Sequence, residues 1–450
     1  MTKRKDTKAK AFTCRGAAAL ITAALLTAAV LLTGCPQSIE NKPNIPSGPD
    51  PNLRIEGGVL KGYNETPAGA LVIPAGVTEI AGSAFSGCTS LTQVNFPASL
   101  TKIGKFAFLG CTGLTNLTLL ASLETLYHYA FSGCKEITGT VVMPANLKTI
   151  GGSAFYNCNK VDAFDFTQCT QLTSIGSGAF RNCTKITAVN LPASLETIED
   201  NAFSSCTNLT TLTVDAANTH LSSQYNIIYD FNKTKLLCCT PNVTQVTFPV
   251  TLTEIADYAF KNCTSLTQVN FPASLTKIGE CAFADCTGLT SLTLPANLEK
   301  LEDGAFIRCT SLTEVHFPAT LTEIDNYAFS DCTGLTSLSL PASLKWLSSM
   351  AFENCSGIEG TVVMPANLRN ISWNAFYNCN KVDTFDFSQC TQLTSIDKNA
   401  FKNCTKITAV NLPASLETID ASAFSGCTNL TTLTVDAAST HLSELFRLSH

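Results

Sequence analysis

The sequence predicts a β-rich repeat solenoid of about fifteen turns, each close to 23 residues long. Three observations predict it. The pentad Ala-Phe-x-x-Cys occurs fourteen times, successive copies are mostly 23 residues apart, and each copy follows a stretch of alternating apolar and polar residues. A fixed period of this length indicates stacked coils, because a single coil cannot bury its own apolar face. The Phe members of the pentads are Phe85, Phe108, Phe131, Phe155, Phe180, Phe203, Phe260, Phe283, Phe306, Phe329, Phe352, Phe376, Phe401 and Phe424.

The unit from Leu91 to Leu114 is representative of the repeat. Apolar and polar residues alternate up to Phe96, which is the period of a strand, and Pro97 ends it. Phe108 and Cys111 are three residues apart, so both can face inward from one short helical turn. Stacking such units predicts a parallel sheet on one face of the solenoid and short helical or irregular segments on the other.

The N-terminal segment, residues 1–34, has the layout of a secretory signal peptide. Basic residues come first, and residues 16–32 are almost purely apolar. The run ends in Leu32-Thr33-Gly34-Cys35, which resembles a bacterial lipobox and implies cleavage before Cys35 and lipidation of its thiol. The alternative is an ordinary signal or a transmembrane anchor, although about 17 apolar residues are marginal for a span.

Residues 35–57 are predicted to be a tether that starts at the lipidated Cys35. Five prolines fall between positions 36 and 51, among Asn, Ser, Gly and Asp. This composition favours extended chain over a packed core. Acyl chains on Cys35 would then be the protein's one connection to a membrane.

The pentads divide the rest of the chain into two repeat blocks, residues 58–214 and 248–437. Residues 215–247 contain no pentad and are predicted to be a hairpin insert, with its strands near Ile227–Tyr229 and Lys235–Cys238. Residues 438–450 are predicted to be a frayed tail, because a terminal repeat normally needs a cap and none is evident.

The two blocks are copies of one another. The series of Phe spacings 23, 23, 24, 25 and 23 occurs in each block, offset by 221 residues, as from Phe85 to Phe306. The extra residue of the 24-residue turn falls at Gly139 and at Gly360, where a β-bulge would absorb it.

The chain has 21 cysteines, and most belong to the pentads. Repeated at one position of stacked turns, each is predicted to be a small buried hydrophobe with a free thiol. Parallel side chains on neighbouring turns do not suit disulfide geometry. Disulfides are the alternative, since an exported protein meets oxidising surroundings.

The composition argues against catalysis and against nucleic acid. The formal net charge of the chain is −6, although residues 1–34 contribute +5. The rest of the chain is therefore strongly acidic and has no basic stripe that would bind phosphates. The five His residues are isolated or duplicates, and no motif predicts a metal site, a cofactor or a catalytic group. We therefore expect a binding protein, not an enzyme.

The outward positions of the predicted strands are the candidate binding surface. They are mostly uncharged amides and hydroxyls, which can bind protein or glycan without strong electrostatic steering, although Thr and Asn also suit any solvated strand. The residues singled out are Gln93, Asn95, Gln268, Asn270, Glu314 and His316.

The repeat L-x-x-[VLI]-x-[FL]-P-x-x-L-x-x-I-x-x-x-A-F-x-x-C resembles the BspA-type, or Treponema-type, leucine-rich repeat over residues 71–435. The resemblance implies a right-handed, leucine-rich-repeat superhelix on the surface of a bacterium. Together with the lipobox, it leads us to expect an exported protein that is lipid-anchored to the bacterial cell envelope, at the outer membrane or cell surface. It also implies adhesion to host extracellular-matrix or cell-surface proteins, glycans or other bacteria. The alternative is a structural envelope or spacer protein without a specific ligand.

Overall fold

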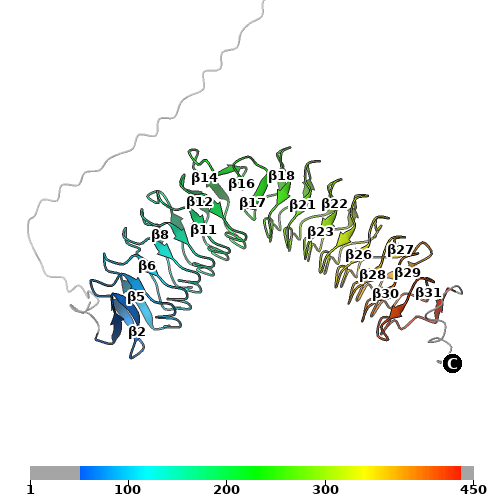
Figure 1. Cartoon of the computed structure of the whole chain (residues 1–450), viewed down its shortest axis with the longest axis horizontal. Helices are drawn as coiled ribbons and strands as arrows, with labels where there is room; N and C mark the ends of the chain where they lie inside the picture. The colour runs from blue at the N-terminus through cyan, green and yellow to red at the C-terminus, as the bar shows by residue number, and fades with distance from the viewer. Residues whose placement is uncertain (1–50, 437–450) are drawn as a thin grey trace, which may run out of the picture. The chain divides into compact units, whose positions relative to one another are not determined.

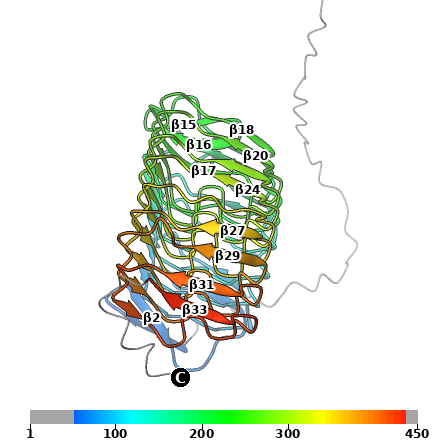
Figure 2. The same ribbon diagram turned by 90° about the vertical axis from the view of Figure 1, so that its right-hand side faces the viewer.

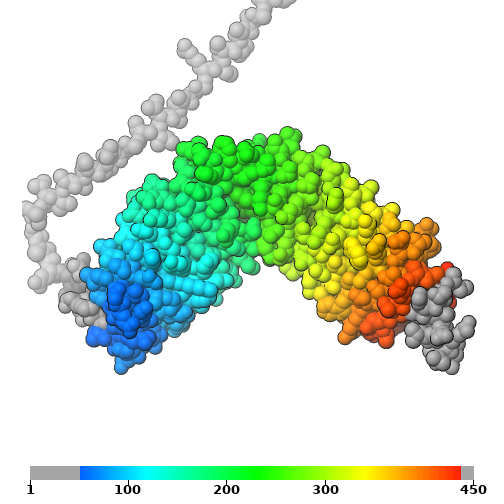
Figure 3. All heavy atoms as spheres, in the orientation of Figure 1, coloured from blue at the N-terminus to red at the C-terminus, as the bar shows by residue number. Residues whose placement is uncertain are grey.

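The computed structural model describes residues 51–436, which form a β-solenoid of about 16 turns. The predicted signal peptide, Cys35, most of the tether and the frayed tail lie outside the described residues. Strands follow one another along the solenoid in sequence order (Figure 1), and the atoms of successive turns form successive bands (Figure 3). The predicted fold class is confirmed, with about one turn more than expected.

Most repeats contribute a first strand, which is the alternating segment that ends before the proline. Each of these strands pairs in parallel with the first strand of a neighbouring turn, as from Ala188↔Thr211 to Leu191↔Val214. Figure 2 shows many of them stacked down one side of the molecule. The first strands are β3 (Gly69–Val72), β5 (Leu91–Asn95), β8 (Thr140–Val142), β10 (Ala163–Asp165), β12 (Ala188–Leu191), β14 (Thr211–Val214), β18 (Gln245–Thr247), β20 (Gln268–Asn270), β22 (Ser291–Thr293), β24 (Glu314–His316), β27 (Gly360–Val363), β29 (Val382–Asp386), β31 (Ala409–Leu412) and β33 (Thr432–Val435).

A second strand of two residues follows in most turns, with its Ile or Leu buried and its preceding residue outward. This segment, expected to be short and extended or irregular, forms the longest sheets, because its pairing continues through the 24- and 25-residue turns. The second strands are β4 (Glu79–Ile80), β6 (Lys102–Ile103), β7 (Thr125–Leu126), β9 (Thr149–Ile150), β11 (Ser174–Ile175), β13 (Thr197–Ile198), β19 (Glu254–Ile255), β21 (Lys277–Ile278), β23 (Lys300–Leu301), β25 (Glu323–Ile324), β26 (Trp346–Leu347), β28 (Asn370–Ile371), β30 (Ser395–Ile396) and β32 (Thr418–Ile419).

The pentads form tight turns instead of the predicted short helical segments, and residues 51–436 contain no helix. The reason is the backbone around the Phe of each pentad, which we call the spine Phe. The residue two before it and the residue two after it often have positive φ, as at Tyr129 (60°) and Asn157 (63°). A right-handed helix cannot continue through such a residue. It follows that no described helix is long and apolar enough to cross a membrane.

Phe and Cys of the pentads form the interior as predicted. Consecutive spine Phe rings within a block stack with centroids 4.8–5.7 Å apart. Of the 19 described cysteines, all free, 18 are buried and Cys281 is half-buried. The typical pentad thiol donates to the carbonyl of the spine Phe one turn earlier, as Cys111 does to Phe85 at 3.1 Å.

Two boundaries differ from the prediction. Strand β1 (Leu53–Glu56) occupies the end of the predicted tether, because it pairs antiparallel with β2 (Val59–Tyr63) at the start of the stack. The insert has three strands instead of two, β15 (Leu221–Gln224), β16 (Ile227–Asp230) and β17 (Lys235–Cys239). They form an antiparallel meander, and β17 then pairs in parallel with β19, so the insert ends near Cys239 and β18 already belongs to block 2.

Candidate functional site

The largest continuous sheet of first strands lies in block 2 and consists of β18, β20, β22 and β24. In each strand the central residue is buried and the two flanking residues are exposed. Parallel register aligns the exposed residues in two rows. We call these eight side chains the block 2 face: Gln245, Gln268, Ser291 and Glu314 in one row, and Thr247, Asn270, Thr293 and His316 in the other.

The structure brings four of the six predicted binding residues together. Gln268, Asn270, Glu314 and His316 all belong to the block 2 face, with β22 between their strands. The remaining two are on β5 of block 1, in a separate two-stranded sheet with β3. There Gln93 donates to the side-chain oxygen of Asn95 at 2.9 Å, and both residues are half-buried.

The pair Glu314 and His316 ends the block 2 face. Nε2 of His316 is 3.3 Å from Oε1 of Glu314, and the side chains are 58% and 55% exposed. A pair this exposed contributes little to folding stability. Its side chains are therefore available to a partner at little cost to the fold.

The sheet is broken immediately beyond β24, which sequence reasoning missed. The next turn has no strand at residues 336–340, and the main-chain N–H and C=O groups of residues 337–340 make no hydrogen bond within the described structure. One turn further, Gly360 has φ +78°, and the register of β27 against β29 shifts between Gly360 and Thr361. This is the predicted bulge, and a bulge of one residue disrupts the ladder beside it.

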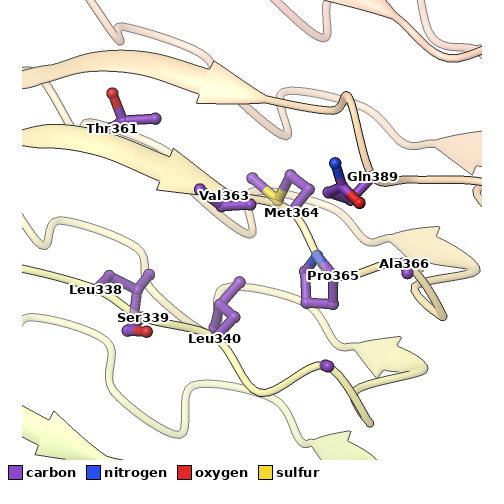
Figure 4. Close-up of a pocket in the computed structure, with 10 residues that line it drawn as sticks. Leu338, Ser339, Leu340, Thr361, Val363, Met364, Pro365, Ala366 and Gln389 are labelled. Carbon is purple, nitrogen blue, oxygen red and sulfur yellow. The ribbon is translucent and has the colours of Figure 1, made fainter.

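A groove of about 440 Å³ lies at this break. Figure 4 shows Leu338 and Leu340 on one turn and Val363, Met364 and Pro365 on the next. Val363 is 47% exposed, which is high for a valine on a sheet. The groove combines apolar side chains with unpaired main-chain groups, and this combination suits contact with another polypeptide.

Block 1 repeats the break. Residues 115–119 have no strand, Gly139 has φ +77°, and Val142, the copy of Val363, is 42% exposed. The 24-residue spacing, visible in the sequence, was therefore a usable signal for both breaks. What it did not reveal is that the bulge opens the sheet on the side of the preceding turn.

The second missed feature is aromatic. The chain has two Trp residues, Trp346 and Trp373, and they are 45% and 43% exposed. The guanidinium of Arg369 lies 5.9 Å from the ring centroid of Trp346. The copy in block 1 has Thr125 and Gly152 at these positions, so comparing the two copies would have singled out both Trp residues.

Charged side chains gather on the second strands. Lys235 and Lys277 lie 3.0 and 3.2 Å from the same oxygen of Glu254. Burial alone would raise the pKa of Glu254, but these two ion pairs outweigh it and lower that pKa. The hydrogen bond to Asp325, 2.9 Å away, raises the pKa of Lys300. These groups neutralise one another, so they give this side no strong net field.

Within residues 51–436 no three His, Cys, Asp or Glu side chains cluster as a metal site would require. What the described surface offers is an exposed polar face beside an apolar groove. Such a surface can form hydrogen bonds and apolar contacts with a macromolecule.

Comparisons with known proteins give the same fold. The family model of the BspA type leucine rich repeat region matches residues 62–170, 161–235, 230–359 and 323–447. A leucine-rich repeat protein from Eubacterium ventriosum is similar at 22% identity, covering 79% of this chain and 93% of that one, with a TM-score of 0.62. The pneumococcal vaccine antigen PcpA is similar at 20% identity, covering 86% and 98%, with a TM-score of 0.56.

A leucine rich cell surface protein from Faecalibacterium prausnitzii is similar at 21% identity, covering 86% of this chain and 95% of that one, with a TM-score of 0.50. At these identities the likenesses establish the fold alone. No curated protein matches the chain. Because the family model covers nearly all of the described residues, the chain belongs to the BspA-type leucine-rich-repeat family.

Proposed function

We propose that this chain is a lipid-anchored bacterial surface protein that binds other proteins through the block 2 face and the adjoining groove. Family membership and the lipobox-like residues before Cys35 support this proposal. So do the names of two similar proteins, one a cell surface protein and the other a vaccine antigen. On this proposal the protein is a binding protein and not an enzyme.

The single observation that carries the binding proposal is the break in the sheet beside Glu314 and His316. Within the four-stranded sheet the main-chain groups pair with neighbouring turns. Residues 337–340 of the next turn leave theirs free, next to the exposed Val363. An extended segment of a partner can pair with such a free edge and place alternate side chains against the groove. The flanking amides and hydroxyls then form a polar rim.

Host extracellular-matrix or cell-surface proteins are the proposed partners, with glycans or other bacteria as further candidates. Immobilised fibronectin and fibrinogen, probed with the purified full chain, test this. We expect saturable binding that falls at least about tenfold in Val363→Glu, because a charge in the groove core must be desolvated. The matched control is Val142→Glu in block 1. Absence of saturable binding to either protein would count against the proposal.

The second candidate is a spacer in the envelope without a specific ligand. It is favoured by repetition outside the block 2 face, where Ala188 and Asn190 recur unchanged as Ala409 and Asn411. Normal display with no partner captured, and no loss of any phenotype on substitution of the block 2 face, would support the spacer.

Display itself has a direct test. Intact cells that express the chain are treated with protease, and fragments of residues 51–436 are identified in the supernatant. We also expect Cys35→Ser to abolish incorporation of labelled fatty acid. Fatty acid incorporation that persists in this variant would exclude Cys35 as the anchor.

A further inference from the structure

The insert separates two hydrophobic cores and contributes to both. Strands β16 and β17 alternate: Ile228 and Cys238 belong to the core of block 1, whereas Ile227, Leu236 and Cys239 belong to the core of block 2. Because successive side chains of a strand point to opposite faces, the pair is a single β-layer between the blocks. We call this place the joint.

The Phe spine is interrupted at the joint. Within the described structure, Phe203 and Phe260 make no ring contact with one another, although each stacks on its neighbour inside its own block. Inside a block the amide of the spine Phe donates to the Ala carbonyl of the next turn, as Phe260 does to Ala282 at 2.8 Å. At the joint the corresponding carbonyl, that of Ala259, accepts the thiol of Cys239 at 3.2 Å instead.

Two thiols face one another there. Inside a block, the pentad thiol donates to the carbonyl of the spine Phe one turn earlier, as Cys286 donates to Phe260 at 3.1 Å. The same pattern would make Cys263 donate to the carbonyl of Phe203. The insert lies between Cys263 and Phe203, and it provides no Phe carbonyl to Cys263. The Sγ atoms of Cys239 and Cys263 are 3.4 Å apart, and the remaining contact of Cys263 is a weak one to the carbonyl of Thr240 at 3.7 Å.

We propose that Cys239 and Cys263 are a disulfide site that clamps the insert to the first pentad of block 2. The two residues lie on adjacent layers of one core, and such layers are about 4.8 Å apart, within the Cα separation that a disulfide spans. Their sulfur atoms need to approach by about 1.4 Å to reach a bond of about 2.05 Å. Cys238 does not compete, because it points into the other core.

The chemistry is thiol–disulfide exchange with a disulfide of an exported oxidoreductase or of a small thiol. The thiolate of Cys239, the more exposed of the two at 7%, attacks the oxidant and releases one reduced thiol. The thiolate of Cys263 then attacks Cys239 in the mixed disulfide and releases the second. Two protein thiols are oxidised to one disulfide, one oxidant disulfide is reduced to two thiols, and the two thiol protons end on those products.

The contact between their sulfur atoms at 3.4 Å, and not burial, distinguishes this pair from the other thiols. Inside the blocks the pentad thiols donate to Phe carbonyls, and desolvation raises the pKa values of those such as Cys309 and Cys355, so few thiolates are available. The pKa values of Cys263 and Cys239 are also raised, the first chiefly by their mutual hydrogen bond and the second by burial. The bond therefore forms while the joint is still open during folding, before the layers close over it.

Trypsin separates the two cysteines, which gives the test a direct readout. Cleavage after Lys235, Lys261 and Lys277 yields one peptide with Cys238 and Cys239 and another with Cys263. The exported full chain is refolded with oxidised glutathione, its thiols are blocked under denaturation, and the digest is analysed without reduction. We expect the two peptides to be linked in the wild type and in Cys238→Ser, and separate in Cys239→Ser and Cys263→Ser.

Thermal unfolding provides the second measurement. Reduction is expected to lower the apparent Tm of the wild type and of Cys238→Ser, and to leave that of Cys239→Ser unchanged. Three results would overturn the proposal: recovery of both wild-type peptides with every thiol alkylated, a vicinal bond between Cys238 and Cys239, or a bond between other pentad cysteines such as Cys111 and Cys134 in place of this one.

Discussion

Strand β5 of block 1 and strand β24 of block 2 occupy the same place in the two copies. The segments Leu91–Pro97 and Leu312–Pro318 differ at two positions, where Gln93 and Asn95 become Glu314 and His316. Both differences face outward. The side chains touch within each pair, through an amide hydrogen bond in block 1 and a contact between a carboxyl oxygen and an imidazole nitrogen in block 2. The duplication has thus kept the interior of this strand and changed its surface.

The same contrast holds at the 24-residue turns. Gly139 and Gly360 have nearly the same φ, and their amides donate to Asp162 and Asp383 of the next turn at 2.9 and 3.1 Å. Around these conserved bulges the outward residues diverge, as from Thr125 to Trp346. Stacking constrains each inward residue by two neighbouring turns, whereas an outward residue meets mostly water. Divergent outward positions are therefore where function is to be sought.

The largest predicted effect concerns the thiols that both interiors share. Burial raises the pKa of Cys158 to about 12 and raises that of its copy Cys379 as well. Unfolded thiols ionise near pH 8.5, so above that pH the unfolded chain releases protons that the folded chain retains. The stability contributed by each protonated thiol is complete below pH 8.5 and is lost as the pH rises toward the folded pKa.

Each thiol whose pKa is raised in the folded state lowers the free energy of unfolding by about 1.4 kcal/mol per pH unit in this range. More than a dozen such thiols act together, as Cys158, Cys206, Cys309 and Cys355 do. We expect cooperative loss of β circular dichroism in both blocks between about pH 9 and 10.5 under reducing conditions, with thiolate absorbance rising in step. A fold that persists at pH 11, or thiolate absorbance that rises before the fold is lost, would show that the thiols are not core groups.

The spine Phe residues are expected to give the next largest effect. Phe131 and its copy Phe352 are both fully buried between two rings. Replacing either with Ala should lower the free energy of unfolding by about 3–5 kcal/mol, because a cavity is left that the stack cannot fill. Urea denaturation of the two variants checks this. Losses that differ by more than about 1 kcal/mol would break the claim that the interiors are equivalent.

The bulge glycines should give a smaller and equal effect. A Cβ added at Gly139 or Gly360 meets no atom within 4 Å, so the cost of Ala is the left-handed backbone alone. We expect about 1–2 kcal/mol for Gly139→Ala and the same for Gly360→Ala. Gly104, which has no room for a Cβ beside Ala81 and Gly82, is the control with a larger loss. A loss at Gly139 or Gly360 as large as that at Gly104 would refute the backbone explanation.

The sequence predicted the features that depend on the repeat period, because every turn repeats the same apolar positions. The spacing of the pentads predicted that Phe180 and Cys183 are buried and that a bulge lies at Gly360, and the structure has all three features. The sequence did not predict the turn structure of the pentads, because residues such as Tyr129 adopt a left-handed backbone against their own preference when neighbouring turns impose it. Nor did it predict the sheet break, since the consequence of Gly360 appears one turn away, at residues 337–340.

The smallest expected effect on stability accompanies the most direct test of the central claim. Glu314→Gln with His316→Asn gives block 2 the outward residues of block 1, and Gln93→Glu with Asn95→His is the reciprocal control. Neither double variant should change the free energy of unfolding by more than about 0.5 kcal/mol, because all four positions are outward. Binding to the partner is measured by surface plasmon resonance for both variants and the wild type. We expect at least a tenfold loss of affinity for the first variant and none for the second; unchanged affinity in the first, or equal loss in both, would show that Glu314 and His316 are not the binding residues.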